Sequence, residues 1–205
     1  MSLTALIAAR AEVAGLSPAP DVVAACAAYL DLLAKWNRRM NLTALAVDPP
    51  SEAAVDRLLL EPLVAARHVL LSDRHLLDLG SGGGSPAIPM KIAAPWLRLT
   101  MVEVREKKAA FLREAARALQ LPEVVVEAKR IEELEPSGSV DVVSLRAVKV
   151  NDQIKSRLLT WPSPDKRVFW FRSPDEATGL TAFEQTERHR LPGDNSELLI
   201  LRAFR

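Results

Sequence analysis

The sequence predicts an α/β protein whose core is a mainly parallel, doubly wound sheet of seven strands that ends in an antiparallel hairpin. From His75 onward, short apolar runs alternate with helical stretches, which is typical of βαβ units. Four of the eight glycines fall within residues 80–84, directly after the first of these runs. Only residues 192–196 separate the last two runs. This connection is too short for a crossover helix, so we expect those two strands to be antiparallel.

The first 72 residues have a different texture, and we expect them to form a helical extension packed on a core domain of residues 73–205. Apolar residues from Val23 to Ala34 recur with the spacing of one helix face. Ser17-Pro18 is expected to start this helix, as a cap followed by a proline. Asp48-Pro49-Pro50 cannot continue a helix, and Ser51 is expected to open another that runs towards Leu71.

The elements of the core domain follow in order along the chain. Strands are expected at 75–79, 98–104, 124–128, 140–145, 167–171, 183–191 and 197–204. Helices are expected at 86–94, 106–120 and 151–159, with a short acidic helical turn at 131–134. A parallel sheet of this kind binds its ligand at the carboxyl ends of its strands.

Length and composition exclude several classes of protein. A chain of 205 residues with 49% hydrophobic and 26% charged residues is an ordinary globular protein rather than a disordered one. No apolar run approaches the ~18 residues of a membrane span, and no signal segment opens the chain. The single cysteine, Cys26, rules out an internal disulfide and a thiolate metal site, so we expect a cytoplasmic protein without a metal. His68, His75 and His189 do not cluster in the sequence, and structural roles are expected for them.

The glycine window is expected to bind a ligand. It reads Asp78-Leu79-Gly80-Ser81-Gly82-Gly83-Gly84-Ser85-Pro86, between the end of a strand and the start of a helix. Glycine permits positive φ and a close approach of the ligand to the backbone, and a helix N-terminus offers free N–H groups. A tight turn alone would need one glycine, so four of them indicate a binding site.

The residues around the window leave two ligands open. Gly82-Gly83-Gly84-Ser85-Pro86-Ala87 satisfies the dinucleotide pattern GxGxxA, which keeps an NAD-dependent oxidoreductase of a small molecule as an alternative. Asp78 would repel a pyrophosphate but suits a cation, and Asp-x-Gly-x-Gly-x-Gly resembles the motif of S-adenosylmethionine-dependent methyltransferases. Glu103, 23 residues after Gly80, is placed to accept hydrogen bonds from the ribose hydroxyls of either ligand.

The end of the fourth strand is expected to face the substrate. It reads Ser144-Leu145-Arg146-Ala147, without the Asn/Asp-Pro-Pro-aromatic signature of exocyclic amino methylation. Cys26 lies on an apolar helical stripe, which disfavours methylation of a pyrimidine C5 through a cysteine nucleophile. A purine ring nitrogen or an oxygen remains, and positioning supplies most of the catalysis for such a target. No catalytic base is assigned, and Arg146 is the candidate that positions a carboxylate or phosphate of the substrate or cofactor.

Two basic clusters are candidates for RNA contact. Lys35, Arg38 and Arg39 lie near the end of the long helix with Trp36 among them. Lys107 and Lys108 open the helix at 106–120. A solvated helix face, or basic residues that complement a helix dipole, explains either cluster equally well.

Motifs over almost the whole chain resemble a bacterial family, the ribosomal RNA small subunit methyltransferases G, also called glucose-inhibited division protein B. The matching segments are Lys35-Trp36-Asn37 with Asn41-Leu42-Thr43, Asp78–Pro89, Lys107–Arg113, Arg130–Glu133 and Ser144–Ala147. The glycine motif alone is generic. The Trp-Asn and Asn-Leu-Thr elements, the two prolines after the glycines and the late Arg-Ala are together specific.

The resemblance implies a Rossmann-like class I methyltransferase fold and methylation of N7 of one guanine in 16S ribosomal RNA, with S-adenosylmethionine as cofactor. By position, Gly80 and Ser85 would line the methionine end of the cofactor, and Arg146 would reach that end or the RNA. Glu103 would bind the ribose, and Ile131 with Glu132 the adenine. The partner would be 16S ribosomal RNA or the small ribosomal subunit, with no membrane, and we expect a monomer.

Three departures from the family pattern accompany the resemblance. Arg57-Leu58 stands where relatives usually carry Arg-His, and Ser85 replaces a bulkier residue, which should loosen the cleft wall. Phe171-Arg172-Ser173 replaces a usual Lys-Gly ending of the fifth strand. Arg57 and Arg172 are further candidates for RNA contact. These departures leave a catalytically weak S-adenosylmethionine-binding protein as a second alternative.

Overall fold

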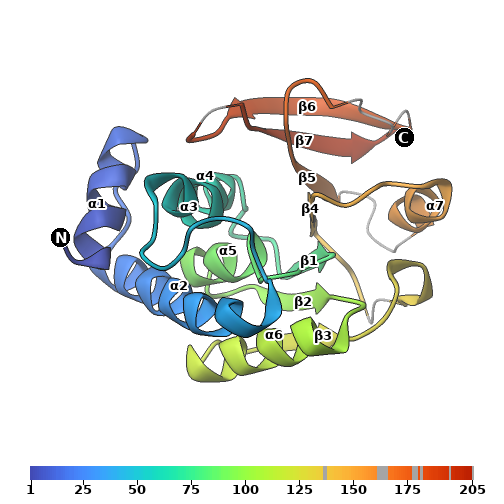
Figure 1. Cartoon of the computed structure of the whole chain (residues 1–205). Helices are drawn as coiled ribbons and strands as arrows, with labels where there is room; N and C mark the ends of the chain where they lie inside the picture. Colours follow the sequence, from blue (N-terminus) through green and yellow to red (C-terminus); the bar gives the residue numbers. More distant parts are fainter. Residues whose placement is uncertain (136–137, 161–165, 177–179, 181, 194, 205) are drawn as a thin grey trace.

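The computed structural model describes residues 1–135, 138–160, 166–176, 180, 182–193 and 195–204. Its centre is a seven-stranded sheet with the strand order β3-β2-β1-β4-β5-β7-β6 (Figure 1). Five strands run parallel, namely β1 (His75–Leu79), β2 (Arg98–Val102), β3 (Val124–Glu127), β4 (Val142–Arg146) and β5 (Arg167–Arg172). The last two, β6 (Phe183–Arg190) and β7 (Glu197–Ala203), are antiparallel to their neighbours. The predicted α/β fold class, with its closing hairpin, is confirmed.

The strand order reverses beside β1. From β1 the chain builds outward through β2 to β3, and it then returns to place β4 on the other side of β1. The register pairs Asp78 of β1 with Ser144 of β4. In doubly wound sheets the crevice at such a reversal, outside the carboxyl ends of the strands, is where ligands bind. The glycine window follows β1 and therefore lies at this crevice.

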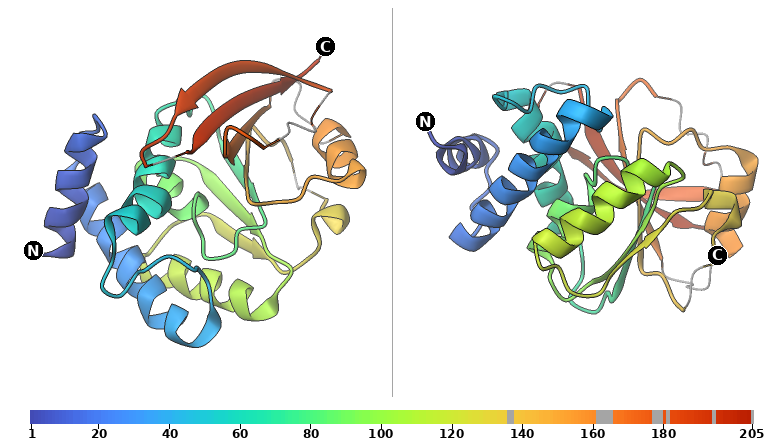
Figure 2. Two further views of the ribbon diagram at one scale, coloured as in Figure 1. Left: turned by 45° about the horizontal axis from the view of Figure 1, so that its top comes forward. Right: turned by 60° about the horizontal axis from the view of Figure 1, so that its bottom comes forward.

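Different helices cover the two faces of the sheet (Figures 1 and 2). The helices α2 (Pro20–Met40), α5 (Ala87–Ala93) and α6 (Glu106–Ala118) share one hydrophobic cluster with Leu76 and Met101 of the sheet. On the opposite face, α7 (Asp152–Thr160) packs with Leu77 and Leu79. Successive residues of β1 thus point to opposite faces, and both faces are apolar, as a covered parallel sheet requires. The first helix, α1 (Leu3–Val13), lies outermost beside α2.

The long helix α2 starts later than the sequence predicts. It begins at Pro20, and Ala19 before it has an extended backbone with φ −61° and ψ 151°. A residue that precedes a proline disfavours the helical conformation, so Ala19 cannot belong to the helix. The predicted start at Ser17-Pro18 is therefore wrong by two residues.

The helical segment after Ser51 is interrupted. It consists of α3 (Glu52–Val55), a π-helical turn at Asp56–Leu60 and α4 (Glu61–Ala66). The Ser51 hydroxyl accepts a hydrogen bond from the Ala54 N–H at 3.1 Å, so the predicted cap is confirmed. The predicted extension to Leu71 is wrong, because α4 ends at Ala66. The wider π turn leaves two acids, Asp56 and Glu61, on the buried side. Among the described residues, no helix has the length and apolar character needed to cross a bilayer.

Candidate functional site

The glycine window forms the loop between β1 and α5. Gly80, Gly82 and Gly84 have φ values of 72°, 53° and 90°, in the region that favours glycine. A Cβ atom at Gly80 would lie 2.8 Å from Val148, and one at Gly84 would lie 2.5 Å from Ile88. At Gly82 the nearest atom would be 3.8 Å away. Packing therefore explains Gly80 and Gly84 without a ligand, whereas a side chain at Gly82 would make only an ordinary contact, so the position is not crowded by the chain itself.

Glu103 fixes the glycine loop. Strand β2 ends at Val102, two residues earlier than predicted, so Glu103 follows the strand and turns towards the loop. Its Oε2 accepts the N–H of Gly82 at 2.9 Å, and its Oε1 accepts the N–H of Arg105 at 2.8 Å. Each carboxylate oxygen has a further lone pair, so Glu103 can still accept a hydroxyl of a ligand.

Four of the predicted site residues line one cavity of about 150 Å³. They are Gly80 and Glu103 from the loops after β1 and β2, and Ile131 and Glu132 from the 3₁₀ turn after β3. Glu132 Oε1 accepts a hydrogen bond from Asn151 at 3.2 Å, which helps to hold the pKa of this carboxyl below its usual range. The cavity therefore combines an apolar side chain, two carboxylates and a glycine at the carboxyl ends of neighbouring strands.

Asp78 is buried at the end of β1 and only half satisfied. Its Oδ1 accepts the Ser144 hydroxyl at 2.5 Å, whereas Oδ2 has no hydrogen-bond partner among the described residues. Burial raises the pKa of the Asp78 carboxyl. A buried acceptor without a donor is costly, and a ligand that brings an N–H would satisfy it. The residues present therefore fit a ligand with a cationic amino group at this point.

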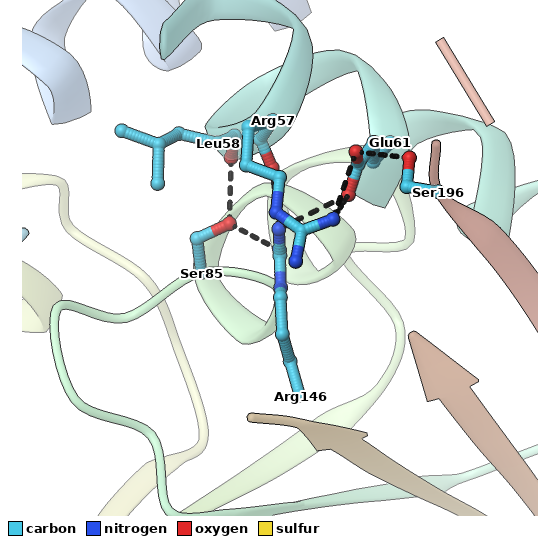
Figure 3. A network of polar contacts seen from close by, with 6 residues as sticks. All are labelled: Arg57, Leu58, Glu61, Ser85, Arg146 and Ser196. Atoms are coloured by element: carbon cyan, nitrogen blue, oxygen red, sulfur yellow. Dashed lines mark hydrogen bonds and ion pairs between the residues drawn. The ribbon is translucent and has the colours of Figure 1, made fainter. Parts of the chain in front are cut away.

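Arg146, the last residue of β4, is the centre of a buried polar network (Figure 3). Its Nη1 donates to the backbone oxygen of Arg57 at 2.5 Å and lies 3.2 Å from Oε2 of Glu61. Its Nη2 donates to the Ser85 hydroxyl at 2.7 Å. Its guanidinium carbon lies 4.9 Å from the ring centre of Phe171. Nε of Arg146 has no hydrogen-bond partner among the residues that the structure describes.

Ser85 links the glycine loop to the π-helical turn. Its hydroxyl accepts from Arg146 and donates to the backbone oxygen of Leu58 at 2.7 Å. The Ser85 hydroxyl therefore ties together three segments that are far apart in the sequence, and whether serine loosens the cleft wall relative to a bulkier residue stays a prediction.

Glu61 is the member of this network that the sequence did not reveal. It is 2% exposed, and its Oε1 accepts the Ser196 hydroxyl at 2.6 Å. Burial raises the pKa of Glu61, and burial lowers the pKa of Arg146 to about 10. Arg146 thus remains cationic at neutral pH. The sequence did contain a signal for Glu61, because it is the one charged residue within the apolar run Leu58-Leu59-Leu60-Glu61-Pro62-Leu63. A buried glutamate is rarely without a partner, so its position in this run indicates a buried ion pair or hydrogen bond.

The predicted site residues therefore fall into two groups. Gly80, Glu103, Ile131 and Glu132 line the small cavity, whereas Ser85 and Arg146 belong to the buried network. Asp78 lies between them, since both Arg146 and Glu103 act electrostatically on its carboxyl group.

The candidates for RNA contact have different surroundings. Lys35, Arg38 and Arg39 are exposed on the last turns of α2, and Lys107 is exposed with Lys108 half-buried at the start of α6. The ring centres of Trp36 and Phe111 are 5.7 Å apart, so the two basic clusters lie on neighbouring helices.

Two further arginines are engaged inside the protein. Arg57 is half-buried and pairs with Glu61 at 3.2 Å. Arg172 is 5% exposed, and its guanidinium donates to the backbone oxygens of Ser173 and Pro174. A direct RNA contact predicted for Arg172 does not fit this burial, because its donors already serve the chain itself.

The order of the strands, the loop at the reversal beside β1 and the closing hairpin define a class I methyltransferase fold. Solved structures show the same fold at low sequence identity. The mitomycin 7-O-methyltransferase MmcR matches with a TM-score of 0.62 and 18% identity, over 100% of this chain and 76% of that one. P. horikoshii TYW2 in complex with MeSAdo matches with a TM-score of 0.58 and 13% identity, over 74% and 62%.

Within this class, the chain belongs to the GidB family, described as rRNA small subunit methyltransferase G, whose model matches residues 23–190. Among curated proteins, the ribosomal RNA small subunit methyltransferase G of Nitrosomonas europaea is 41% identical over 119 residues, 58% of this chain and 53% of the relative. That of Methylobacillus flagellatus is 42% identical over 133 residues, 65% and 62%. The matched region thus spans little more than half the length of these relatives. The family predicted from the motifs is confirmed.

Proposed function

We propose that the protein is an S-adenosylmethionine-dependent methyltransferase that methylates N7 of a guanine in 16S ribosomal RNA of the small subunit. The observation that carries the proposal is the pocket at the strand reversal, where the open backbone of Gly82 adjoins Glu103 and the cavity of Ile131 and Glu132. The name shared by the relatives supports the substrate class. Family membership does not favour the NAD-dependent oxidoreductase.

The cofactor would be held along the carboxyl ends of the strands. Ile131 would pack on the adenine beside Glu132, and Glu103 would accept the ribose hydroxyls. Among the residues that the structure describes, the two buried side-chain polar atoms without a partner have opposite character, since Asp78 Oδ2 accepts and Arg146 Nε donates. This pair suits the ammonium and the carboxylate of an amino acid. S-adenosylmethionine, when bound there, supplies a methyl group on a positively charged sulfur.

The target base would enter beside the buried network. A cavity of about 580 Å³ adjoins Arg57 and Glu61, and Thr43 and Ser173 also line it. Guanine N7 carries a free lone pair, so the chain needs to supply no base and acts by positioning the ring. The basic clusters of α2 and α6 would hold the RNA backbone. In this scheme residues 73–205 form the methyltransferase domain, residues 1–72 contribute to the RNA side, and the protein acts as a cytoplasmic monomer.

The decisive experiment is methyl transfer to small ribosomal subunits that lack the modification. Wild-type protein, labelled S-adenosylmethionine and 30S particles should yield 7-methylguanine in 16S ribosomal RNA, located by mass spectrometry of nuclease fragments. Calorimetry with S-adenosylmethionine and with NAD runs in parallel. Binding of S-adenosylmethionine without transfer to 30S particles or free 16S ribosomal RNA would support the catalytically weak alternative. Binding of NAD alone would refute the proposal.

A further inference from the structure

Two histidines and a glutamate that are distant in the sequence meet at the edge of the sheet. His68 lies in the turn after α4, and Glu187 and His189 are alternate residues of β6, so their side chains share one face of that strand. Oε2 of Glu187 is 3.3 Å from Nδ1 of His68 and 2.9 Å from Nε2 of His189. All three potential ligand atoms lie within 4.8 Å of one another. Two histidines that do not cluster in the sequence thus meet in the folded chain.

We propose that His68, Glu187 and His189 bind a divalent transition-metal ion, with Zn²⁺ as the best match. Imidazole nitrogen and carboxylate oxygen are ligands that Zn²⁺ accepts, and three protein ligands leave a fourth position for water. Bonds of about 2.0–2.2 Å in tetrahedral geometry hold neighbouring ligand atoms about 3.3–3.5 Å apart. The 3.3 Å separation between His68 and Glu187 matches this distance, whereas the 2.9 Å separation between Glu187 and His189 is that of a hydrogen bond and must widen when an ion binds. Mg²⁺ and Ca²⁺ prefer sets of oxygen ligands, which this cluster does not offer.

Positive charge near the cluster affects how tightly it can hold a cation. The cationic groups that face the cluster are Arg67, which acts on His68, and Arg167, which acts on Glu187. Both oppose a cation, so we expect the site to bind Zn²⁺ less tightly than a closed structural site does.

The backbone around His68 is held in place. Arg167 donates from Nη1 to the backbone oxygen of His68 at 2.6 Å and forms a buried ion pair with Asp73. An ion at the cluster would connect this anchored turn to β6, which pairs only with β7 within the sheet. A groove of about 830 Å³ that runs past His68 and His189 gives the fourth position access to water. Binding of the ion should therefore hold the C-terminal hairpin in place on the helical region and raise the thermal stability of the protein.

Titration of the tag-free full-length protein with ZnCl₂ tests the proposal. Calorimetry should give one ion per chain, and the thermal midpoint should rise with Zn²⁺ and return when EDTA is added. His189→Gln and Glu187→Gln should each weaken Zn²⁺ binding by at least about tenfold. Loss of a residue that only supports a metal ligand already costs about tenfold in affinity or more, so loss of a ligand itself should cost no less. Glu184→Gln is the matched control, because Glu184 lies exposed on the same strand outside the cluster.

A second measurement does not depend on the folding of any variant. Co²⁺ added to the wild-type protein should produce the intense visible absorption of a tetrahedral site, and Zn²⁺ should abolish it by displacement. Equal Zn²⁺ affinity of the wild type and His189→Gln would overturn the proposal, as would the absence of Zn²⁺ binding or of the Co²⁺ bands. Because the cluster shares no residue with the Arg146 network or the glycine loop, this result is independent of methyl transfer.

Discussion

Arg146→Ala removes the side chain that joins β4 to the π-helical turn and to the glycine loop. Glu61, 2% exposed, loses a cation at 3.2 Å. The backbone oxygen of Arg57 and the hydroxyl of Ser85 lose a donor as well. Removing one partner of a buried ion pair typically costs about 3–5 kcal/mol. Glu61 keeps its contacts with Arg57 and Ser196, so we expect the lower end, about 3 kcal/mol.

This loss should depend on pH. Burial raises the pKa of Glu61 above its ordinary value of 4.5, so the folded state binds the proton more tightly than the unfolded state does. The stability gained in this way is present below that ordinary value and is lost as the pH rises through the raised folded value. Arg146 offsets part of this effect by stabilising the charged form of Glu61, so its removal raises the pKa of Glu61 further. The destabilisation by Arg146→Ala should therefore be larger at neutral pH than in acid.

Urea denaturation and thermal unfolding, both followed by circular dichroism at neutral and acid pH, measure the loss and its pH dependence. The thermal midpoint should fall by about 6–12 °C, because 1 kcal/mol corresponds to about 2–4 °C for a domain of this size. A cycle with Glu61→Gln and the double variant isolates the coupling between the two side chains. Arg117→Ala is the control, since Arg117 pairs with Glu114 on the exposed surface of α6 and its loss should leave the midpoint unchanged. Additive effects of Arg146→Ala and Glu61→Gln would refute the reasoning.

Three further predictions concern other parts of the molecule. Gly82→Val should weaken S-adenosylmethionine binding at least about tenfold in calorimetry, which corresponds to a loss of about 1.4 kcal/mol, because the side chain occupies the space that the ligand needs beside a backbone with φ 53°. Gly15→Val is the control, because Gly15 has a similar φ of 67° and lies outside the glycine loop; equal losses of affinity in the two variants would contradict the site. Burial lowers the pKa of His75, so the unfolded state takes up protons first and the free energy of unfolding falls as the pH drops below the ordinary value of 6.5. His75→Gln should flatten this pH dependence in urea denaturation. A variant whose free energy of unfolding varies with pH as in the wild type would contradict the prediction. Arg39→Ala and Lys107→Ala should each make the plot of log affinity for RNA against log salt concentration less steep, by the equivalent of about one phosphate contact. Filter binding measures this slope, and a slope equal to that of the wild type would contradict the RNA contact of the residue.

The sheet could be predicted because each of its strands is a short apolar run bounded by turn or helix signals. The five-residue loop before Glu197 was enough to make the last two strands antiparallel. The π-helical turn could not be predicted, since Leu58-Leu59-Leu60 is equally apolar in an α-helix and in the wider turn. The meeting of His68 with His189 was also out of reach, because it depends on the tertiary position of β6 rather than on local spacing.

In the candidate site, too, one part follows from local sequence signals and the topology, and another part depends on tertiary packing. Gly80, Glu103 and Ile131 each follow a strand, so their common position at one edge of the sheet follows from the topology. The partners of Arg146 come from residues 57, 61 and 85, at sequence separations of 89, 85 and 61. Separations of that size leave no periodic signal, and only packing of the helical region on the sheet brings these groups together.

The departures at Leu58 and Ser85 have unequal consequences for the arginine. The network uses the backbone oxygens of Arg57 and Leu58, which any residue at those positions supplies, so a leucine at 58 leaves it intact. The hydroxyl of Ser85, in contrast, accepts from Nη2 of Arg146, which an apolar side chain at 85 could not do. Among the described contacts Nη1 has two protein partners and Nη2 has one, so Nε and the second N–H of Nη2 remain as donors for a ligand. The serine therefore exchanges part of the ligand-binding capacity of Arg146 for a firmer connection between the glycine loop and the helical region.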